Sequence, residues 1–229
     1  MHRIIAMSRY HMILFGLAIG AGLVSFAVVA SAQDEPVVQS EAPAPTLDAD
    51  VILAEAIFAG GCFWCVESDF DKVDGVVETI SGYTGGTLIA PTYRQVSKEN
   101  TGHYEAVKVS YDPSKVTYPE LVEYFWRHVD PTDEGGQFCD RGSSYRTAIF
   151  AGTPEERSVA EGSKAAIDAS GVLNNPIVTP ILDAATFWPA EDYHQDYYQK
   201  NPIRYELYRN GCGRDRTIDR VWAGERADG

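Results

Sequence analysis

The chain has 229 residues, a formal net charge of −14 at pH 7 and a hydrophobic fraction of 45%. The hydrophobic fraction is typical of a globular protein, and the acidic balance argues against nucleic acid or an anionic membrane as a partner. No internal repeat is visible, so the length indicates a single domain with a sizeable core once the terminal segments are set aside.

The first 32 residues are typical of a secretory signal peptide. Arg3 and Arg9 form a basic start, an apolar run without charge follows over residues 12–30, and Ala30-Ser31-Ala32 forms an A-x-A cleavage site. The apolar run approaches the length of a short membrane span, so an uncleaved N-terminal anchor is the alternative. Either way, we expect the rest of the chain to be exported, to the periplasm or out of the cell.

A segment rich in Pro, Ala and acidic residues follows over residues 33–50. It has no hydrophobic periodicity and cannot bury enough apolar surface to offset its chain entropy, which is typical of a flexible linker. We therefore expect one domain over residues 51–222 and a short tail over residues 223–229.

The domain alternates strand and helix patterns. Strands are expected over residues 55–59, 76–83, 103–111, 145–151 and 177–182, and residues 87–102 should be irregular. Helices are expected over residues 62–70, 117–130, 153–170 and 190–200, the second with a capping box from Thr117 to Glu120 and the third closed by Gly171. This order predicts an α+β fold, a two-layer sandwich with a mixed sheet and a ferredoxin-like core.

The chemistry is concentrated around Cys62, which follows two glycines and begins a predicted helix. Free N–H groups at a helix start favour the thiolate, the nucleophilic form of cysteine. Phe63 and Trp64 beside it could form an apolar wall for a small group such as a methyl, although core packing explains them equally simply. Glu105 shares a strand face with Val107 and Val109, so it either faces the buried side, where desolvation favours the protonated acid, or reaches water at the strand edge.

Eight short motifs occur in an order that resembles the peptide methionine sulfoxide reductase A family over roughly residues 54–213. They are Gly61-Cys62-Phe63-Trp64, Gly82-Tyr83-Thr84-Gly85-Gly86, Pro91-Thr92-Tyr93, Thr101-Gly102-His103-Tyr104-Glu105, Asp130-Pro131-Thr132, Gln137-Phe138-Cys139-Asp140, Tyr145-Arg146 and Ala190-Glu191-Asp192-Tyr193-His194-Gln195.

The resemblance implies a role for each matching residue. Cys62 corresponds to the nucleophile, Glu105 to the acid that protonates the sulfoxide oxygen, and Phe63 with Trp64 to the pocket for the substrate methyl. Further positions rest on the resemblance alone: the phenols Tyr93 and Tyr145, which bind the oxygen, and Asp140, which orders the polar side of the site.

The implied reaction converts methionine-(S)-sulfoxide, free or in proteins, to methionine and leaves Cys62 as a sulfenic acid. A second thiol then forms a disulfide that an external thioredoxin-like dithiol reduces, so that oxidised proteins are repaired. We expect a monomer that uses no cofactor and no metal. Lone histidines such as His103 and His194 should be structural hydrogen-bond partners.

The resolving thiol is open between two cysteines. Cys212 lies between glycines in a segment expected to be mobile, and we favour it. Cys65 is close to Cys62 but is expected to point elsewhere, and Cys139 is expected to be a small buried side chain.

Two other classes of protein and a metal site remain as alternatives. A thioredoxin-like oxidoreductase would use Cys62 and Cys65 as a C-x-x-C pair, and a non-catalytic exported module would hold the four cysteines in two structural disulfides. A metal site from Cys62, Cys65 and Cys212 with a histidine has no paired-ligand spacing to support it.

Overall fold

The computed structural model describes residues 52–222. The predicted signal peptide, linker and C-terminal tail lie outside this part of the chain, as does the first residue of the predicted domain. Within residues 52–222, no helix combines the length and apolar character that crossing a bilayer requires.

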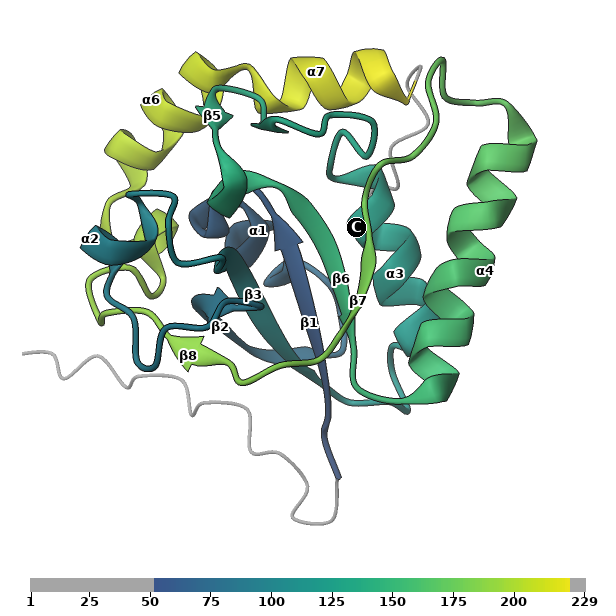
Figure 1. The fold of residues 1–229 in the computed structure, drawn as a ribbon, viewed down its shortest axis with the longest axis horizontal. Coiled ribbons are helices and arrows are strands. Elements are labelled where there is room, and N and C mark those ends of the chain that lie inside the picture. Colours follow the sequence, from purple (N-terminus) through teal and green to yellow (C-terminus); the bar gives the residue numbers. More distant parts are fainter. Residues whose placement is uncertain (1–51, 223–229) are drawn as a thin grey trace, which may run out of the picture. The chain divides into compact units, whose positions relative to one another are not determined.

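The described residues form strands and helices that alternate along the chain (Figure 1). The strands are β1 (Ala54–Gly60), β2 (Val76–Thr84), β3 (Tyr104–Tyr111), β4 (Gly136–Gln137), β5 (Asp140–Arg141), β6 (Thr147–Ala151), β7 (Ile181–Asp183) and β8 (Trp188–Pro189). The helices are α1 (Phe63–Phe70), α2 (Tyr93–Val96), α3 (Tyr118–Arg127), the 3₁₀ helix η1 (Ser143–Tyr145), α4 (Pro154–Ser170), α5 (Tyr197–Lys200), α6 (Pro202–Cys212) and α7 (Arg214–Val221).

The main sheet has the strand order β7-β6-β1-β3-β2-β8. Its strand pairs are antiparallel except β6 with β7, so the sheet is mixed as predicted. Strands β1, β2, β3 and β6 with helices α1 and α3 follow a βαββαβ path, which is the ferredoxin-like core. The predicted α+β fold is confirmed.

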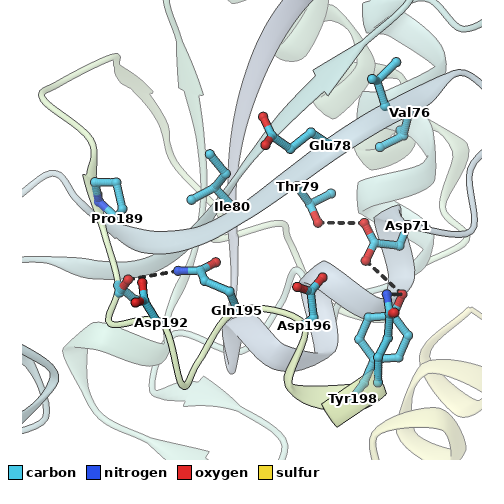
Figure 2. Close-up of a pocket in the computed structure, with 13 residues that line it drawn as sticks. Asp71, Val76, Glu78, Thr79, Ile80, Pro189, Asp192, Gln195, Asp196 and Tyr198 are labelled. Atoms are coloured by element: carbon cyan, nitrogen blue, oxygen red, sulfur yellow. Dashed lines mark hydrogen bonds between the residues drawn. The ribbon is translucent and has the colours of Figure 1, made fainter. Parts of the chain in front are cut away.

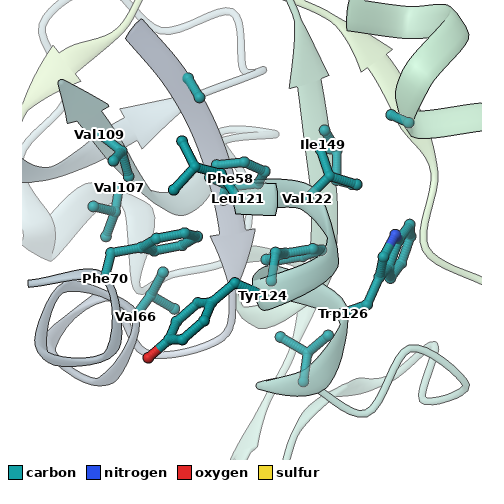
Figure 3. Packing of buried hydrophobic residues seen from close by; sticks show 14 of the residues in the cluster. Phe58, Val66, Phe70, Val107, Val109, Leu121, Val122, Tyr124, Trp126 and Ile149 are labelled. Atoms are coloured by element: carbon teal, nitrogen blue, oxygen red, sulfur yellow. The ribbon is translucent and has the colours of Figure 1, made fainter. Parts of the chain in front are cut away.

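The core lies between this sheet and the helices α1 and α3 (Figure 3). Phe58 on β1 is fully buried and stacks on Phe70 of α1 and on Phe125 of α3, at ring-centroid distances of 4.9 and 5.2 Å. Burying an aromatic side chain of this size contributes about 1.5–3 kcal/mol. The packing fixes the end of β1 and the start of α1, where Cys62 lies.

Two helix starts are formed as the sequence indicates. Thr117 and Glu120 make the capping box of α3, with the Thr117 N–H donating to Glu120 Oε2 at 2.8 Å. Thr153 accepts the N–H of Glu156 at the start of α4, and Gly171 ends that helix in the left-handed conformation. These side chains satisfy backbone groups that have no partner inside the helix.

Two predicted elements are shorter than expected. The strand predicted over 177–182 pairs only from Ile181, because the N–H groups of Val178 and Thr179 donate to Pro131 instead. The helix predicted over 190–200 forms only as α5, because Asp196 adopts a positive φ of 50° and the preceding side chains bond to other elements.

Three of the α-helices were not predicted. α2 lies inside the segment expected to be irregular and has its own capping box from Thr92 to Gln95. α6 and α7 cover the C-terminal region, and Gly213 joins them with a φ of 69°. The segment around Cys212, expected to be a mobile glycine-rich stretch, is therefore the last turn of a helix.

Candidate active site

Cys62 lies at the junction between β1 and α1, where it is the N-cap residue of α1. The turn requires Gly61, whose φ is 86° and whose position leaves no room for a side chain: a Cβ there would lie 2.6 Å from Gln137 Cβ. The Cys62 side chain is only 7% exposed. The sequence motif thus places the thiol at the inner end of a small cavity.

The cavity measures about 60 Å³. Seven of its lining residues are the predicted nucleophile, acid, phenols, aspartate and apolar wall, and the eighth was not predicted: Cys62, Glu105, Tyr93, Tyr145, Asp140, Phe63, Trp64 and Tyr208. These residues come from α1, α2, β3, β5, η1 and α6 and are separated by up to about 150 positions in the chain. Of the predicted site residues, the structure leaves only Cys212 out of this cavity.

Glu105 is buried, with 2% of its surface exposed, which decides between the two alternatives that its place on the strand left open. Burial raises its pKa to about 8, although the backbone N–H of Phe63 donates to Oε2 at 3.1 Å and opposes the shift. The negative charge of Asp140 raises the pKa further. The carboxyl group therefore holds a proton at neutral pH and can act as an acid.

Two phenols lie beside Glu105. The side chains of Tyr93 and Tyr145 are in hydrogen-bond contact with each other, and Tyr145 also contacts the carboxyl group of Glu105. Burial raises the pKa of both phenols, and the charge of Glu105 raises them further. Both hydroxyls therefore stay protonated and can donate to an oxygen bound in the cavity.

Phe63 and Trp64 form the apolar side of the cavity. Phe63 is 1% exposed, and Trp64 stacks on Tyr197 with 3.7 Å between the ring centroids. The indole N–H of Trp64 donates to Nδ1 of His194 at 3.0 Å. Burial lowers the pKa of His194 to about 4, so the imidazole is neutral and can accept this bond. Trp64 is thereby held from two sides.

Both histidines in the family-like motifs have structural partners, as predicted. His194 supports Trp64, and His103 accepts the N–H of Gly86 at 3.2 Å through Nδ1 while its Nε2 lies 2.8 Å from the carbonyl oxygen of Leu88. The contacts of His103 with Gly86 and Leu88 fix the loop that precedes β3, the strand that contains Glu105.

The polar side of the cavity contains a residue that the sequence did not single out. The hydroxyl group of Tyr208 on α6 donates to Asp140 Oδ2 and also lowers the pKa of Cys62 through a hydrogen bond. Because α6 was not predicted, nothing in the local pattern placed Tyr208 near the motif of Cys62. Burial raises the pKa of Asp140, whereas Tyr208 and the charge of Arg214 oppose that shift.

The two cysteines of α1 form a hydrogen-bonded pair. Burial raises the pKa of Cys62, and the hydrogen bond and negative charge of Cys65 raise it further. The bond from Cys62 lowers the pKa of Cys65, and the guanidinium groups of Arg214 and Arg209 lower it as well. The expected lowering of the Cys62 pKa at the helix start is not found, because the thiol is buried beside Cys65 and Glu105.

The expectation that Cys65 points away from Cys62 is also wrong. The two residues are three positions apart, which places them on one face of a helical turn. Cys65 is 2% exposed and belongs to the same buried polar region as Asp69.

Cys139 and Cys212 form a disulfide with 4.9 Å between their Cα atoms, while Cys62 and Cys65 are free. Cys139 is exposed, so its prediction as a buried side chain is wrong. The disulfide joins β5 to α6 next to the cavity, since Cys139 precedes Asp140 and Cys212 lies one helical turn after Tyr208.

One cluster within residues 52–222 brings possible metal ligands together: Cys139, Asp140 and Cys212, with their ligand atoms within 4.8 Å of one another. Both sulfur atoms belong to the disulfide, so they do not offer thiolates to a metal in this structure.

A buried thiol facing a protonated carboxyl group and two phenols, with a disulfide nearby, defines a thiol-dependent oxidoreductase site on a ferredoxin-like core. The family model for peptide methionine sulfoxide reductase matches residues 54–226. The chain belongs to this family.

Relatives and solved structures agree with this assignment. Peptide methionine sulfoxide reductase MsrA 2 of Rhizobium meliloti (strain 1021) is 58% identical over 172 residues, which cover 75% of this chain and 84% of the relative. MsrA of Bacillus pumilus (strain SAFR-032) is 52% identical over 168 residues, covering 73% and 94%. Mxr1 from Saccharomyces cerevisiae in reduced form has a TM-score of 0.62 at 31% identity, covering 69% of this chain and 90% of the other.

Proposed function

We propose that this protein reduces methionine-(S)-sulfoxide, free or in exported proteins, to methionine, with Cys62 as the nucleophile. The observation that carries the proposal is the position of the Cys62 thiol in one small cavity with the protonated acid Glu105 and the phenols Tyr93 and Tyr145. A sulfoxide sulfur becomes electrophilic when its oxygen is protonated or strongly hydrogen-bonded, and these three groups can supply that.

In the first step the Cys62 sulfur attacks the sulfoxide sulfur. The sulfoxide oxygen receives the proton of Glu105 while the phenols donate hydrogen bonds to it, and Phe63 with Trp64 encloses the methyl group. The oxygen then passes to Cys62, methionine leaves, and Cys62 remains as a sulfenic acid. The oxygen atom and two electrons are thereby exchanged between the substrate sulfur and Cys62.

The thiol of Cys62 must lose its proton for this attack, although burial raises its pKa. Two features favour the loss. Glu105 carries no charge while it is protonated, so it does not repel a thiolate at Cys62. The Tyr208 hydroxyl, whose proton is donated to Asp140, is in polar contact with the Cys62 sulfur and lowers the pKa of the thiol.

We propose that Cys212 resolves the sulfenic acid and that Cys139 completes a relay. The Cys212 thiol displaces water from the sulfenic acid to form a Cys62–Cys212 disulfide. The Cys139 thiolate then attacks the Cys212 sulfur of this disulfide, which forms the Cys139–Cys212 disulfide and releases Cys62. The product of this relay is a Cys139–Cys212 disulfide with Cys62 free, the cysteine state that the structure contains. Because Gly211 and Gly213 flank Cys212, unwinding the last turn of α6 requires little free energy.

The Cys139–Cys212 disulfide then needs an external dithiol. Cys139 is exposed, so a thioredoxin-like protein can reach its sulfur, whereas Cys62 and Cys65 are buried. The signal-like N-terminal sequence suggests that this occurs in the periplasm or outside the cell, with the chain cleaved or anchored there. The cavity residues come from a single chain, which is consistent with a monomer.

A second candidate function has one observation in its favour. Cys62 and Cys65 are free, hydrogen-bonded to each other and spaced as in a C-x-x-C motif, which a thioredoxin-like disulfide oxidoreductase would use. That function gives no role to Glu105, Tyr93 or Tyr145.

The two functions separate in one experiment with the Cys65→Ser variant. We expect this variant to release methionine from the S epimer of methionine sulfoxide at a rate within about tenfold of the wild type, because Cys62 still has its acid and phenols. If the protein instead worked through a Cys62–Cys65 disulfide, the Cys65→Ser variant would lose all activity. Release of methionine by Cys62→Ser would contradict our proposal, and the R epimer serves as the matched control substrate.

A further inference from the structure

The outer edge of β2 is open along most of its length. β8 pairs with β2 only at Gly82 and Tyr83, and within residues 52–222 no strand pairs with Val76–Ile80 on that side. A groove of about 560 Å³ runs along this edge, between β2 and the segment that contains α5 (Figure 2). A free strand edge presents N–H and C=O groups that can pair with another extended chain.

The side chain of Gln195 shows where pairing along this edge stops. Its amide accepts the N–H of Ser81 at 2.9 Å and donates to the carbonyl oxygen of Ser81 at 2.9 Å. It therefore takes the place that a peptide group of a neighbouring strand would occupy. Because strand residues alternate, Thr79 is the next residue whose backbone groups face the same side, and the bulge at Val77 interrupts the alternation beyond it.

The groove is acidic. Four carboxylates line it, from Asp71, Glu78, Asp192 and Asp196, and no lysine or arginine does. Lys200, which does not line the groove, forms an ion pair with Asp196 at an Nζ–Oδ2 distance of 3.5 Å. The side chains of Glu78 and Asp192 are exposed.

A fifth carboxylate lies behind the groove. Glu67 is fully buried, and burial raises its pKa to about 7 together with the charges of Asp71 and Asp196, against hydrogen bonds from the Asp196 backbone and the Ser81 side chain. A cation in the groove would relieve this concentration of negative charge.

The charges select among possible occupants of the edge. The chain's own segment over residues 33–51 contains acidic residues and no lysine or arginine, so it would be repelled. A second copy would bring its own Glu78 and Asp192 to the same edge. A bulge at Val77 and the charge of Glu78 also discourage indiscriminate pairing, as is common on sheet edges. The remaining occupant is an extended chain with positive side chains.

The groove and the catalytic cavity share a wall. In this wall Gln195 faces the groove, whereas the adjacent His194 supports Trp64 in the cavity. β2 continues from the groove to Tyr83, whose ring packs against Phe63 at 5.9 Å. At about 3.3 Å per strand residue, the groove begins roughly 10 Å along β2 from Tyr83. A few extended residues therefore span from one site to the other.

We propose that the open edge of β2 binds a lysine- or arginine-containing extended segment of the oxidised protein substrate as an added β-strand. This inference rests on the proposed reduction of methionine sulfoxide and names the class of protein that the enzyme reduces most efficiently. The substrate main chain pairs with Thr79, and its basic side chains meet Glu78 and Asp192.

Steady-state kinetics with three substrates test this inference on the full chain. Two peptides of equal length carry one methionine sulfoxide, a short Gly-Ser spacer and either a Lys-Thr or a Glu-Thr repeat; the third substrate is free methionine sulfoxide. We expect KM to be about 3- to 10-fold lower for the Lys-Thr peptide at low salt, the range that a few exposed charge pairs give, with kcat equal for both peptides.

The double variant Glu78→Gln, Asp192→Asn should abolish this difference in KM, whereas the matched control Glu155→Gln on α4 should preserve it. All three proteins should reduce free methionine sulfoxide equally. Equal KM values for the two peptides in the wild type, or a difference that persists in the double variant, would contradict peptide binding in the groove. Neither result would contradict the proposed reductase activity. Failure with free methionine sulfoxide would instead overturn the proposed function and this inference with it.

Hydrogen exchange gives a readout that does not depend on activity. An unoxidised Lys-Thr peptide should slow exchange of the Thr79 amide in the wild type and not in the double variant. Unchanged exchange at this amide with the peptide bound would show that no strand is added.

Discussion

At the scale of single residues, Glu105 combines burial with a position next to the nucleophile. Its raised pKa serves the reaction twice: the proton is available for the sulfoxide oxygen, and the absence of charge spares Cys62 from repulsion. Both effects disappear when the carboxyl group ionises. The pH dependence of the reaction therefore reports directly on this side chain.

We expect kcat/KM to fall as pH rises through about 8, because the acid form exists below the pKa of Glu105 and is lost above it. Glu105→Gln should lower kcat/KM by roughly 10²–10⁴-fold, the usual contribution of a general acid, and should remove this limb of the profile. A variant that keeps the same limb would show that another group supplies the proton.

Tyr208 is a second residue with a measurable role. Its hydroxyl bonds to Asp140 and to the Cys62 sulfur, so Tyr208→Phe removes two polar contacts while the ring remains. We expect kcat to fall roughly 10- to 100-fold, the effect of losing a hydrogen bond to a charged group, with little change in stability. Alkylation of Cys62 by iodoacetamide should also slow, and an unchanged alkylation rate would contradict the contact.

The residues that the sequence made visible are those whose chemistry has a local signal. Cys62 follows two glycines at a helix start, and the alternation along β3 places Glu105 on the same face as Val107 and Val109. Tyr208 has no such signal, because it reaches the cavity from a distant helix. The expected stabilisation of the Cys62 thiolate was wrong, and the lowered pKa of Cys65 was not predicted for a similar reason: besides the hydrogen bond from Cys62, it depends on Arg214 and Arg209 of the C-terminal helices.

At the scale of elements, the disulfide between Cys139 and Cys212 connects the β5 region to α6. If this disulfide is the end of the relay, removal of either cysteine should stop recycling without stopping the first chemical step. Cys139→Ser and Cys212→Ser should therefore each release about one methionine per chain in the absence of reductant, by the chemistry of a single sulfenic acid.

Turnover supported by thioredoxin should fall in both variants by at least tenfold. Dithiothreitol, which can reach Cys62 as a small molecule, should restore part of the rate. Full thioredoxin-supported turnover in Cys212→Ser would move the resolving role to Cys65, the remaining thiol beside Cys62.

The elements that the sequence predicts correctly are those whose terminal backbone groups form hydrogen bonds with side chains nearby in the sequence. The capping side chains of α3 and α4 lie within three residues of the groups that they bond, so local pattern was sufficient. Residues 190–196 form turns instead of the predicted helix because Gln195 bonds to Ser81 and His194 to Trp64. These partners lie more than a hundred positions away, and no local pattern contains them.

At the scale of the whole molecule, a buried ion network joins the C-terminal helices to α1. Asp69 is 2% exposed and lies 2.8 Å from Arg209 Nη1 and 3.5 Å from Arg214 Nη2. Arg214 in turn donates to the carbonyl oxygens of Gly60 and His128. The network holds α6 and α7 on the core and thereby keeps Tyr208 and Cys212 close to Cys62.

Asp69→Asn should lower the free energy of unfolding by about 3–5 kcal/mol, because the buried guanidinium group of Arg214 loses its counter-charge and that of Arg209 keeps only Asp215. Glu161→Gln is the matched control: its pair with Arg157 is exposed on α4, and its loss should cost less than about 1 kcal/mol. Urea denaturation measures both changes. Equal and small effects in the two variants would show that the network does not carry the C-terminal helices.

The central claim is that Cys62 takes the oxygen of the sulfoxide. The most direct measurement uses a variant in which Cys62 is the only cysteine, with Cys65, Cys139 and Cys212 each changed to serine. After reaction with one equivalent of methionine-(S)-sulfoxide, we expect one methionine per chain and one added oxygen atom on Cys62 by mass spectrometry, trapped as a sulfenic acid with dimedone. Methionine release without modification of Cys62, or no release at all, would contradict the account.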